Sequence, residues 1–280
     1  MLRHDLSPAA VALLGADAKV GVLATVDPAG RPHVTLITSL SAKGPQKLMF
    51  GQFSEGLSKT HVRVQPKVGF LALDGERCWL RGKAVWRSAV RQGEDFEMYN
   101  RKPMFRYNAY FGIHTVHYLD VVEAEEGGEL KVPSLVAGAA LARATRITAV
   151  ARCTTPALTP WAAKLVSRAS TLKFASYVGD DGHPVLIPGV GACTAGAGRL
   201  VVACPAGDEA AARLPDSVVV SVFALDRELH SVLVRGQLAR RCRAARALLS
   251  TLDIDWVYNS MPPKHGQIFP RMELRSAALA

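Results

Sequence analysis

The chain repeats itself after 152 positions. Three short landmarks return in the same order: Ser7-Pro8 as Thr159-Pro160, Gly30-x-Pro32 as Gly182-x-Pro184, and Lys47-Leu48 as Arg199-Leu200. This period is longer than the roughly 20 to 50 residues of solenoid repeats, so each copy is predicted to be a whole domain. Two similar domains on one chain can pack as a pseudo-dimer.

Further along, the landmarks return at larger offsets, as insertions in loops would produce. Leu80-Arg81-Gly82-Lys83 is matched by Val234-Arg235-Gly236-Gln237, and Tyr99-Asn100-x-x-Pro103 by Tyr258-Asn259-x-x-Pro262. The alternative is that Gly and Pro turns recur in any β-rich protein, but the constant order favours duplication. We expect a first domain over 1–125, a connector with a helix over 126–158 and a second domain over 159–280.

Composition describes a globular protein with a basic surface. The 280 residues are 49% hydrophobic and 21% charged, which is enough chain for two cores. The net charge of +10 raises the question of nucleic acid or a membrane as partner. The densest basic run, Arg235 to Arg246, carries Leu238, Ala244, Leu248 and Leu249 at helical spacing and is interpreted as a solvated helix face. We therefore expect no specific nucleic-acid partner, and no run is long enough to predict a membrane span.

Cysteine usage indicates a reducing compartment. The five cysteines are scattered, with no CxxC pair and no spacing typical of zinc ligands. We expect them to be reduced, the protein to be cytoplasmic, and no metal to be bound.

Strand-like segments dominate both copies. In the first copy, Ser7 and Pro8 begin a helix that ends at Gly15, and a second helix is expected over 94–101. The predicted strands of this copy are 20–26, 33–38, 47–50, 68–73, 79–86 and 115–123. In the second copy they are 172–178, 185–190, 200–204, 218–225 and 231–238, followed by a helix over 243–252.

An alanine-rich helix over 134–146, capped by Ser134, is expected to connect the two copies. The predicted fold class is mainly β (α+β): two tandem split antiparallel β-barrels with short peripheral helices.

One segment between two predicted strands has the residues of a phosphate site. Gly56, Ser58, Lys59 and Thr60 lie together, and a helix is expected to begin at Ser58. Helix N-termini offer unpaired N–H groups, and a lysine adds a full positive charge. The alternative is a capped surface helix without a ligand.

At this point the chain resembles a known family. The order of Gly30-Arg-Pro-His33, Leu48-Met-Phe50, Ser58-Lys59-Thr60, Pro66-Lys-Val68 and Leu80-Arg-Gly-Lys83 is similar to that of the FMN-binding split β-barrels. These form the pyridoxamine 5'-phosphate oxidase-like superfamily, and the likeness is greatest to small bacterial FMN-binding proteins. It covers residues 19–123 well and 170–240 more loosely.

The resemblance implies FMN as cofactor and assigns residues to it. The phosphate would be held by Lys59 and Thr60 with help from Ser58. The isoalloxazine ring would lie along the backbone of Val34, Thr35, Leu36 and Ile37, with Gln52 and Phe53 at its edge. Family members usually bind FMN at a dimer interface, so a homodimer is a further expectation. The oxidases have Arg-Lys where this chain has Lys-Thr, and we predict no pyridoxal-phosphate pocket.

The second copy lacks the cation of the first. Its equivalent loop carries Asp208 and Glu209 where the first copy has Lys59, and carboxylates repel a phosphate dianion. We expect this copy to have lost the cofactor and to cover the FMN of the first.

An aromatic and basic segment follows the first barrel's helix. Its residues could line a substrate pocket, or could simply cover the barrel end: Tyr99, Arg101, Lys102, Phe105, Arg106, Tyr107, Tyr110, Phe111, His114, His117 and Tyr118. His114 and His117 are not expected to form a metal pair, because an offset of three on a strand places them on opposite faces.

These observations favour an FMN-dependent oxidoreductase that acts on a small, anionic substrate, with NADH or NADPH as electron donor. The cofactor would supply the chemistry, so no catalytic side chain is assigned. One alternative is a non-catalytic flavin or haem protein that carries electrons. Another is an interaction protein without a cofactor.

Overall fold

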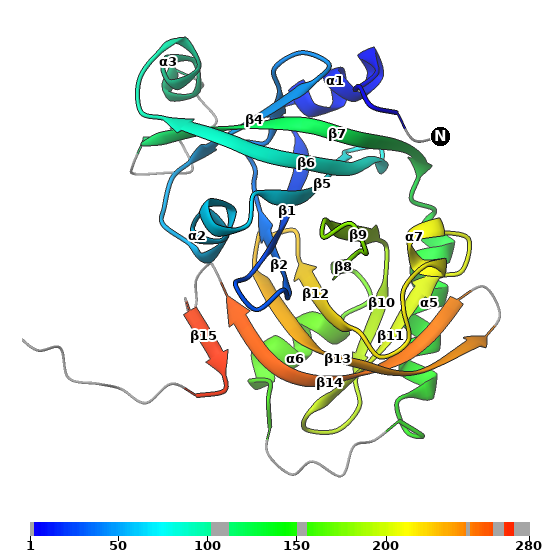
Figure 1. Ribbon diagram of the computed structural model, residues 1–280. Coiled ribbons are helices and arrows are strands. Elements are labelled where there is room, and N and C mark those ends of the chain that lie inside the picture. Colours follow the sequence, from blue (N-terminus) through cyan, green and yellow to red (C-terminus); the bar gives the residue numbers. More distant parts are fainter. Residues whose placement is uncertain (1–2, 102–111, 150–155, 245–246, 260–265, 272–280) are drawn as a thin grey trace, which may run out of the picture. The chain divides into compact units, whose positions relative to one another are not determined.

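The computed structural model describes residues 3–101, 112–149, 156–244, 247–259 and 266–271 (Figure 1). The chain forms two compact units. Unit 1 comprises residues 1–132 together with 176–186, and unit 2 comprises 133–175 together with 187–280. No helix in the described ranges is long and apolar enough to cross a membrane.

Unit 1 is built on a seven-stranded antiparallel sheet. Its strands are β1 (Lys19–Val26), β2 (Pro32–Leu36), β3 (Ser41–Ala42), β4 (Lys47–Gln52), β5 (Lys67–Asp74), β6 (Cys78–Val90) and β7 (Thr115–Glu129). They lie in the order β2-β1-β5-β6-β7-β4-β3. Phe50, Phe70 and Leu80 fill the core on one face of this sheet, where Leu14 of the first helix joins them.

This sheet must curl. Its edge strands, β2 and β3, are joined by residues 37–40 alone, which can span at most about 18 Å. A flat sheet of seven strands would hold its edges roughly 29 Å apart, at about 4.8 Å per strand. The connection therefore requires the barrel-like curvature that the sequence predicted.

The second sheet repeats the first strand for strand. It comprises β8 (Leu172–Val178), β9 (Pro184–Pro188), β10 (Gly191–Thr194), β11 (Arg199–Pro205), β12 (Val219–Leu225), β13 (Ser231–Ala244), β14 (Ala247–Asn259) and β15 (Gly266–Phe269). Read from β9, its order is β9-β8-β12-β13-β14-β11-β10, with β15 added to β14. Because β1 to β7 and β8 to β14 occupy equivalent places, the predicted duplication is also a duplication of topology. The predicted mainly β, antiparallel fold class is confirmed.

Short helices accompany both sheets. They are α1 (Pro8–Gly15), α2 (Leu57–Val64), α3 (Glu94–Arg101), α5 (Val132–Thr145), α6 (Pro160–Ser167) and α7 (Glu209–Ala212). Ser7 caps α1 by accepting the N–H of Ala10, and Thr159 caps α6 by accepting that of Ala162, each with Pro at the first helical position. The start at Ser7 and Pro8 was predicted from the sequence, and Thr159-Pro160 is its repeat.

The repeated Arg-Gly pair lies at or next to a bulge in both sheets. The ladder shifts register between Lys83 and Ala84 on β6, one residue after Gly82, and between Arg235 and Gly236 on β13. A Cβ at Gly82 would overlap the carbonyl oxygen of Glu123, and one at Gly236 would overlap that of Asp253. The preceding arginines also match, because Arg81 lies over the Trp79 ring and Arg235 over the Trp256 ring, at 4.8 and 4.7 Å. Only glycine allows the backbone carbonyls of Glu123 and Asp253 to come this close to residues 82 and 236.

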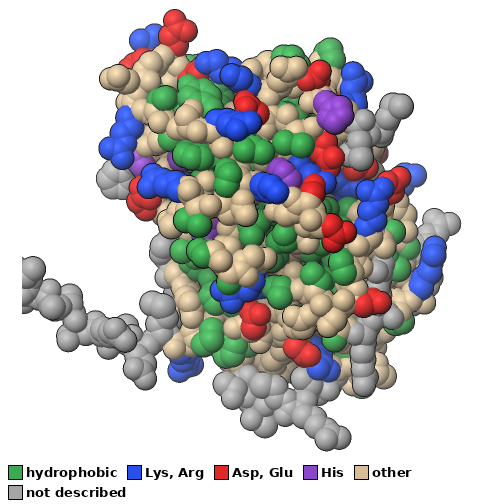
Figure 2. Space-filling view, in the orientation of Figure 1, with side chains coloured by type: hydrophobic (Ala, Val, Ile, Leu, Met, Phe, Trp, Pro, Cys, Tyr) green, Lys and Arg blue, Asp and Glu red, His purple; other side chains and the backbone are tan. Residues whose placement is uncertain are grey.

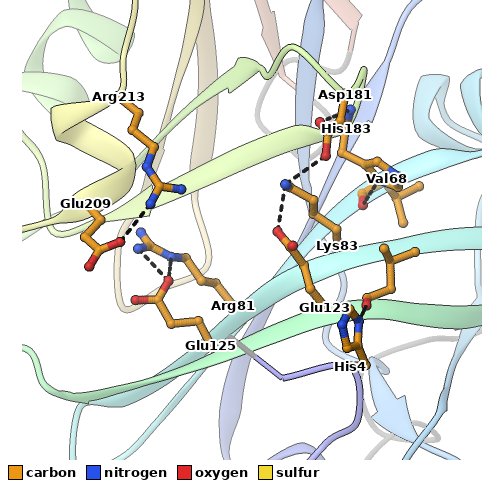
Figure 3. A network of polar contacts seen from close by, with 11 residues as sticks. His4, Val68, Arg81, Lys83, Glu123, Glu125, Asp181, His183, Glu209 and Arg213 are labelled. Carbon is orange, nitrogen blue, oxygen red and sulfur yellow. Dashed lines mark hydrogen bonds and ion pairs between the residues drawn. The ribbon is translucent and has the colours of Figure 1, made fainter. Parts of the chain in front are cut away.

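A segment from the second copy, 176–186, belongs to unit 1 (Figure 3). Lys83 pairs with Glu123 at 2.7 Å and with Asp181 at 2.8 Å. Arg81 forms an ion pair with Glu125 and donates to the carbonyl of Leu186 at 3.2 Å. His183 bonds the carbonyl of Val68 at 3.4 Å. These contacts place the turn after β8 beside β5 and β6.

The predicted helix over 243–252 is wrong. Within this range, residues 243–244 end β13 and residues 247–252 belong to β14, where Leu249 and Leu252 are buried. β14 pairs with both β11 and β13, and two complete ladders outweigh the helix propensity of alanine and leucine. The interpretation of Arg235 to Arg246 as a helix face is also wrong, because residues 235–244 lie in β13.

Other expectations need smaller corrections. β7 continues to Glu129, where the sequence predicted an end at 123, because its Glu-rich end still pairs with β6. The helix predicted over 134–146 begins two residues earlier, at Val132. The Tyr-Asn landmark is not a structural equivalence, since Tyr99 lies in α3 whereas Tyr258 lies in β14.

Alanine at Gly82 or Gly236 is expected to destabilise the protein by about 2 kcal/mol or more, because the added methyl meets backbone that cannot move away. The matched control is Gly128→Ala, also in a strand, where no atom lies within 4 Å of the added Cβ. Urea unfolding measures all three. Equal midpoints for G82A, G236A and G128A would contradict the close approach.

Candidate functional site

Curling of the first sheet brings a hydroxyl of β2 to the helix that follows β4. Thr35 on β2 and Ser58 on α2 are both buried, and their hydroxyl groups form a hydrogen bond. Val34 and Ile37 are also buried, whereas Leu36 is half-buried. β2 is an edge strand of its sheet, so one side of its backbone is not used by the ladder.

The N-terminus of α2 has no side-chain cap. The helix begins at Leu57, one residue before the predicted start, and the capping position is Gly56. Ser7, Thr159 and Asp208 each accept an N–H at the starts of α1, α6 and α7. At α2 no side chain caps the first turn, where the Lys59 N–H donates to the carbonyl of Gly56 at 3.1 Å. The positive end of the helix dipole therefore suits an anion.

Lys59 adds a buried positive charge at the same place. Its residue is only 8% exposed, and its Nζ lies 3.8 Å from where a Cβ of residue 56 would stand. The side chain therefore folds back over the N-terminus of its own helix. Burial lowers the pKa of Lys59, and the negative charge of Glu55 opposes that effect. Among the described residues, no hydrogen bond or ion pair holds this ammonium group.

We call Thr35, Gly56, Ser58 and Lys59 the α2 cradle. It joins two hydroxyls, an uncapped helix end and a buried cation, a combination that suits a phosphate group. Thr60, which the resemblance pairs with Lys59, is exposed on α2 and does not join the buried hydroxyls.

A buried polar chain supports the loop that leads into the cradle. Trp86 Nε1 donates to His117 Nδ1 at 3.1 Å, and His117 Nε2 lies 2.6 Å from Gln52 Oε1. Gln52 in turn donates to the carbonyl of Ser54 at 3.3 Å. The His117 ring stacks on Phe50, its cross-strand partner, with centroids 4.6 Å apart. Phe53, the other residue expected at a ring edge, is half-buried.

His117 is held neutral. Burial lowers the pKa of His117 to about 4, and the positive charges of Lys59 and Arg63 and the neighbouring His114 act in the same direction. A fully buried, neutral imidazole with both nitrogens hydrogen-bonded stabilises the structure; it is not placed to exchange protons with a substrate. The sequence grouped His117 with a possible substrate pocket and gave no indication of its link to Trp86.

Two further buried histidines, His33 on β2 and His61 on α2, lie at the inner face of α2. Thr25 Oγ1 is 3.1 Å from His61 Nδ1, and the rings of His33 and His61 meet edge to face at 5.1 Å. His61 follows Ser58 by one helical turn, so this contact fixes the inner face of α2 against β1 and β2. Sequence reasoning missed His61, although its spacing from Ser58 places both on one face of the helix.

The aromatic segment is only partly described. Lys102, Phe105, Arg106, Tyr107, Tyr110 and Phe111 lie outside the described residues. Tyr99 is buried and donates to the carbonyl of Ser39 at 2.8 Å, which anchors α3. Arg101 is exposed and pairs with Glu97 at 3.7 Å. The described part is therefore structural.

The second copy is built differently at the equivalent helix. Asp208 is the N-cap of α7, and its carboxylate accepts the N–H of Ala211 at 3.1 Å. A carboxylate of the chain itself thus occupies the position that is open at α2. Elsewhere in unit 2, Asp226, Glu228 and His230 lie close enough to hold a metal ion, but the Asp226 carboxylate already accepts the N–H groups of Glu228 and His230.

Charge does not gather at one place on the visible face. Figure 2 shows basic and acidic side chains interspersed there. The net charge of +10 is therefore no argument for an extended anionic partner on that face.

Comparison with known proteins gave matches among solved structures. No family model matches the chain, and no curated protein matches it significantly. An FMN-binding protein from Syntrophomonas wolfei is 17% identical, with a TM-score of 0.37 over 43% of this chain and 85% of its own. A FAD-binding protein from Mesorhizobium loti is 14% identical, with a TM-score of 0.32 over 46% and 98%. A protein described as F420 reductase is 18% identical, with a TM-score of 0.33 over 41% and 94%.

The buried neutral His117 predicts a pH-dependent stability. Unfolded histidine takes up a proton as the pH falls through about 6.5, whereas folded His117 does so only near 4. The unfolded state therefore binds more protons in this window, and stability is lost as the pH falls. Between pH 7.5 and 4, the wild type should lose about 3 kcal/mol more of its unfolding free energy than His117→Asn.

Urea unfolding at several pH values measures this difference. The control is His4→Asn, which removes an exposed histidine and should keep the wild-type pH dependence. Parallel curves for the wild type and H117N would show that His117 titrates normally.

Proposed function

We propose that unit 1 binds FMN at the α2 cradle and that the protein is an FMN-dependent oxidoreductase acting on a small molecule. One observation carries the proposal: a buried lysine without a hydrogen-bond partner among the described residues lies over an uncapped helix N-terminus. Leaving a cation buried and unpaired is costly, so the site is complementary to an anion that enters it.

Each residue of the site has a role in this proposal. Lys59 neutralises the phosphate, and one of the two hydroxyls of Ser58 and Thr35 donates to its oxygens, because the other hydroxyl spends its proton on the hydrogen bond between them. First-turn N–H groups of α2 complete the phosphate contacts, and Thr60, which is exposed, has no part in them. The backbone of Val34 to Leu36 on the edge strand β2, and of Ile37 directly after it, supports the ring, with Gln52 and Phe53 at its rim.

When bound, the flavin supplies hydride and electron transfer. The protein's part is to anchor the phosphate, orient the ring and limit access of water, and none of these tasks requires an ionisable catalytic side chain. We further propose NADH or NADPH as electron donor. Turnover of either by the FMN-loaded protein, with a small acceptor present, would support an enzyme; stable FMN binding without turnover would favour an electron carrier.

Replacing Lys59 by methionine should weaken FMN binding by about 10- to 100-fold, the loss of one charge-assisted hydrogen bond. Isothermal titration with FMN and with riboflavin, which lacks the phosphate, distinguishes a loss of phosphate binding from a general loss of flavin binding. The wild type should prefer FMN, and K59M should lose most of that preference while binding riboflavin as the wild type does.

Lys47→Met is the matched control, since Lys47 is an exposed lysine on β4 of the same sheet. It should behave as the wild type does. An undiminished preference of K59M for FMN over riboflavin would move the phosphate site elsewhere.

A further inference from the structure

We propose that Trp86 and His117 fix the side-chain amide of Gln52 so that its nitrogen, and not its oxygen, is presented to the ligand of the α2 cradle. The amide then acts as a specificity-determining donor. The direction of these hydrogen bonds is set by Trp86, whose indole N–H can only donate. The identity of the acceptor rests on the proposed function.

The chain of hydrogen bonds has one possible direction. The indole N–H of tryptophan is a donor only, so His117 Nδ1, 3.1 Å from Trp86 Nε1, must accept. A neutral imidazole carries one proton, which must then sit on Nε2. Nε2 therefore donates across 2.6 Å to Gln52, and the Gln52 atom facing it must be the carbonyl oxygen. This resolves the amide orientation, which heavy-atom positions alone leave ambiguous.

The orientation leaves one amide N–H of Gln52 over. The amide nitrogen uses one N–H on the carbonyl of Ser54, in the loop that leads into α2. Among the described residues, no acceptor meets the second N–H, although Gln52 is only 1% exposed. A buried donor without a partner is costly, and a ligand acceptor would satisfy it.

The surroundings hold this arrangement in place. Phe50 stacks on the His117 ring with an interplanar angle of 6°, which fixes the plane of the imidazole. A half-turn of the ring within that plane would break its hydrogen bonds to Trp86 and Gln52. His117 lies fully buried on β7, and the register of β4 and β7 sets Phe50 opposite it. A ligand with an acceptor at this point is favoured over one with a donor, because Gln52 cannot rotate to offer its oxygen.

For a flavin, this donor has a redox consequence. The pyrimidine edge of isoalloxazine carries carbonyl and ring-nitrogen acceptors that gain negative charge on reduction. An N–H fixed toward such an acceptor stabilises the reduced form more than the oxidised form. Loss of the donor should therefore weaken binding of reduced relative to oxidised flavin by about tenfold, which is a fall of about 30 mV in the two-electron potential.

Two measurements test the inference, and the first needs no flavin. Nitrogen-15 NMR of the ligand-free protein reports which ring nitrogen of His117 carries the proton. The proton should be on Nε2 in the wild type, and Trp86→Phe should yield a mixture of tautomers. A proton on Nδ1 in the wild type would overturn the proposal whatever the protein binds.

The second measurement is the midpoint potential of bound flavin in the wild type, W86F and Gln52→Met. Trp79→Phe is the control, because it removes the other indole of β6, which stacks on Arg81 and lies outside this chain of bonds. W86F and Q52M should show the lower potential, and W79F the wild-type value. Q52M leaves Trp86 and His117 intact, so it remains informative if W86F folds poorly.

The outcomes separate the two proposals. Flavin that binds with an unchanged potential in both Q52M and W86F would overturn the role of Gln52 and leave the FMN proposal standing. A wild type that binds no flavin would overturn the FMN proposal, and the tautomer of His117 would then decide the orientation of the amide.

Discussion

The candidate site exists because the first sheet closes on itself. β2 and β4 are five strand spacings apart in the sheet order, which in a flat sheet would separate them by about 24 Å. The short connection over 37–40 brings the two edges together, and the hydroxyls of Thr35 and Ser58 then meet across the closure. The bulge between Lys83 and Ala84, next to Gly82, supplies local bending of the kind that such curvature needs. The site residues are thus brought together by the closure of the sheet backbone.

The two copies share this strand order and differ at the N-terminus of one helix, which is α2 in the first copy and α7 in the second. At α7, Asp208 satisfies the backbone within the chain, so the copy is complete without a ligand. At α2, Gly56 provides no side-chain acceptor and Lys59 is buried beside it. Native proteins rarely leave a buried cation unpaired, and those that do usually place it at a functional site. Of these two helix ends, that of α2 in unit 1 is therefore the one suited to bind an anion.

Local signals in the sequence predicted most of the first copy. The helix start at Ser7 and Pro8 and the β-rich runs each depend on neighbouring residues alone, and the structure confirms them. The burial of Lys59 was not predictable in this way, because it depends on the folding of the side chain back toward Gly56. The chain from Trp86 through His117 to Gln52 joins three different strands and left no pattern in the sequence. For the same reason the sequence predicted a helix over 243–252, where the first half of β14 lies, since the two ladders of β14 are formed with distant residues.

The membership of residues 176–186 in unit 1 has a consequence for biosynthesis. Lys83 and Arg81 emerge from the ribosome long before Asp181 and Leu186, their partners in this unit. The first barrel therefore cannot complete its contacts as soon as its own copy has been translated. These contacts of β5 and β6 can form only once residues 176–186, near the start of the second copy, have been made. Completion of the first barrel is therefore tied to synthesis of part of the second copy.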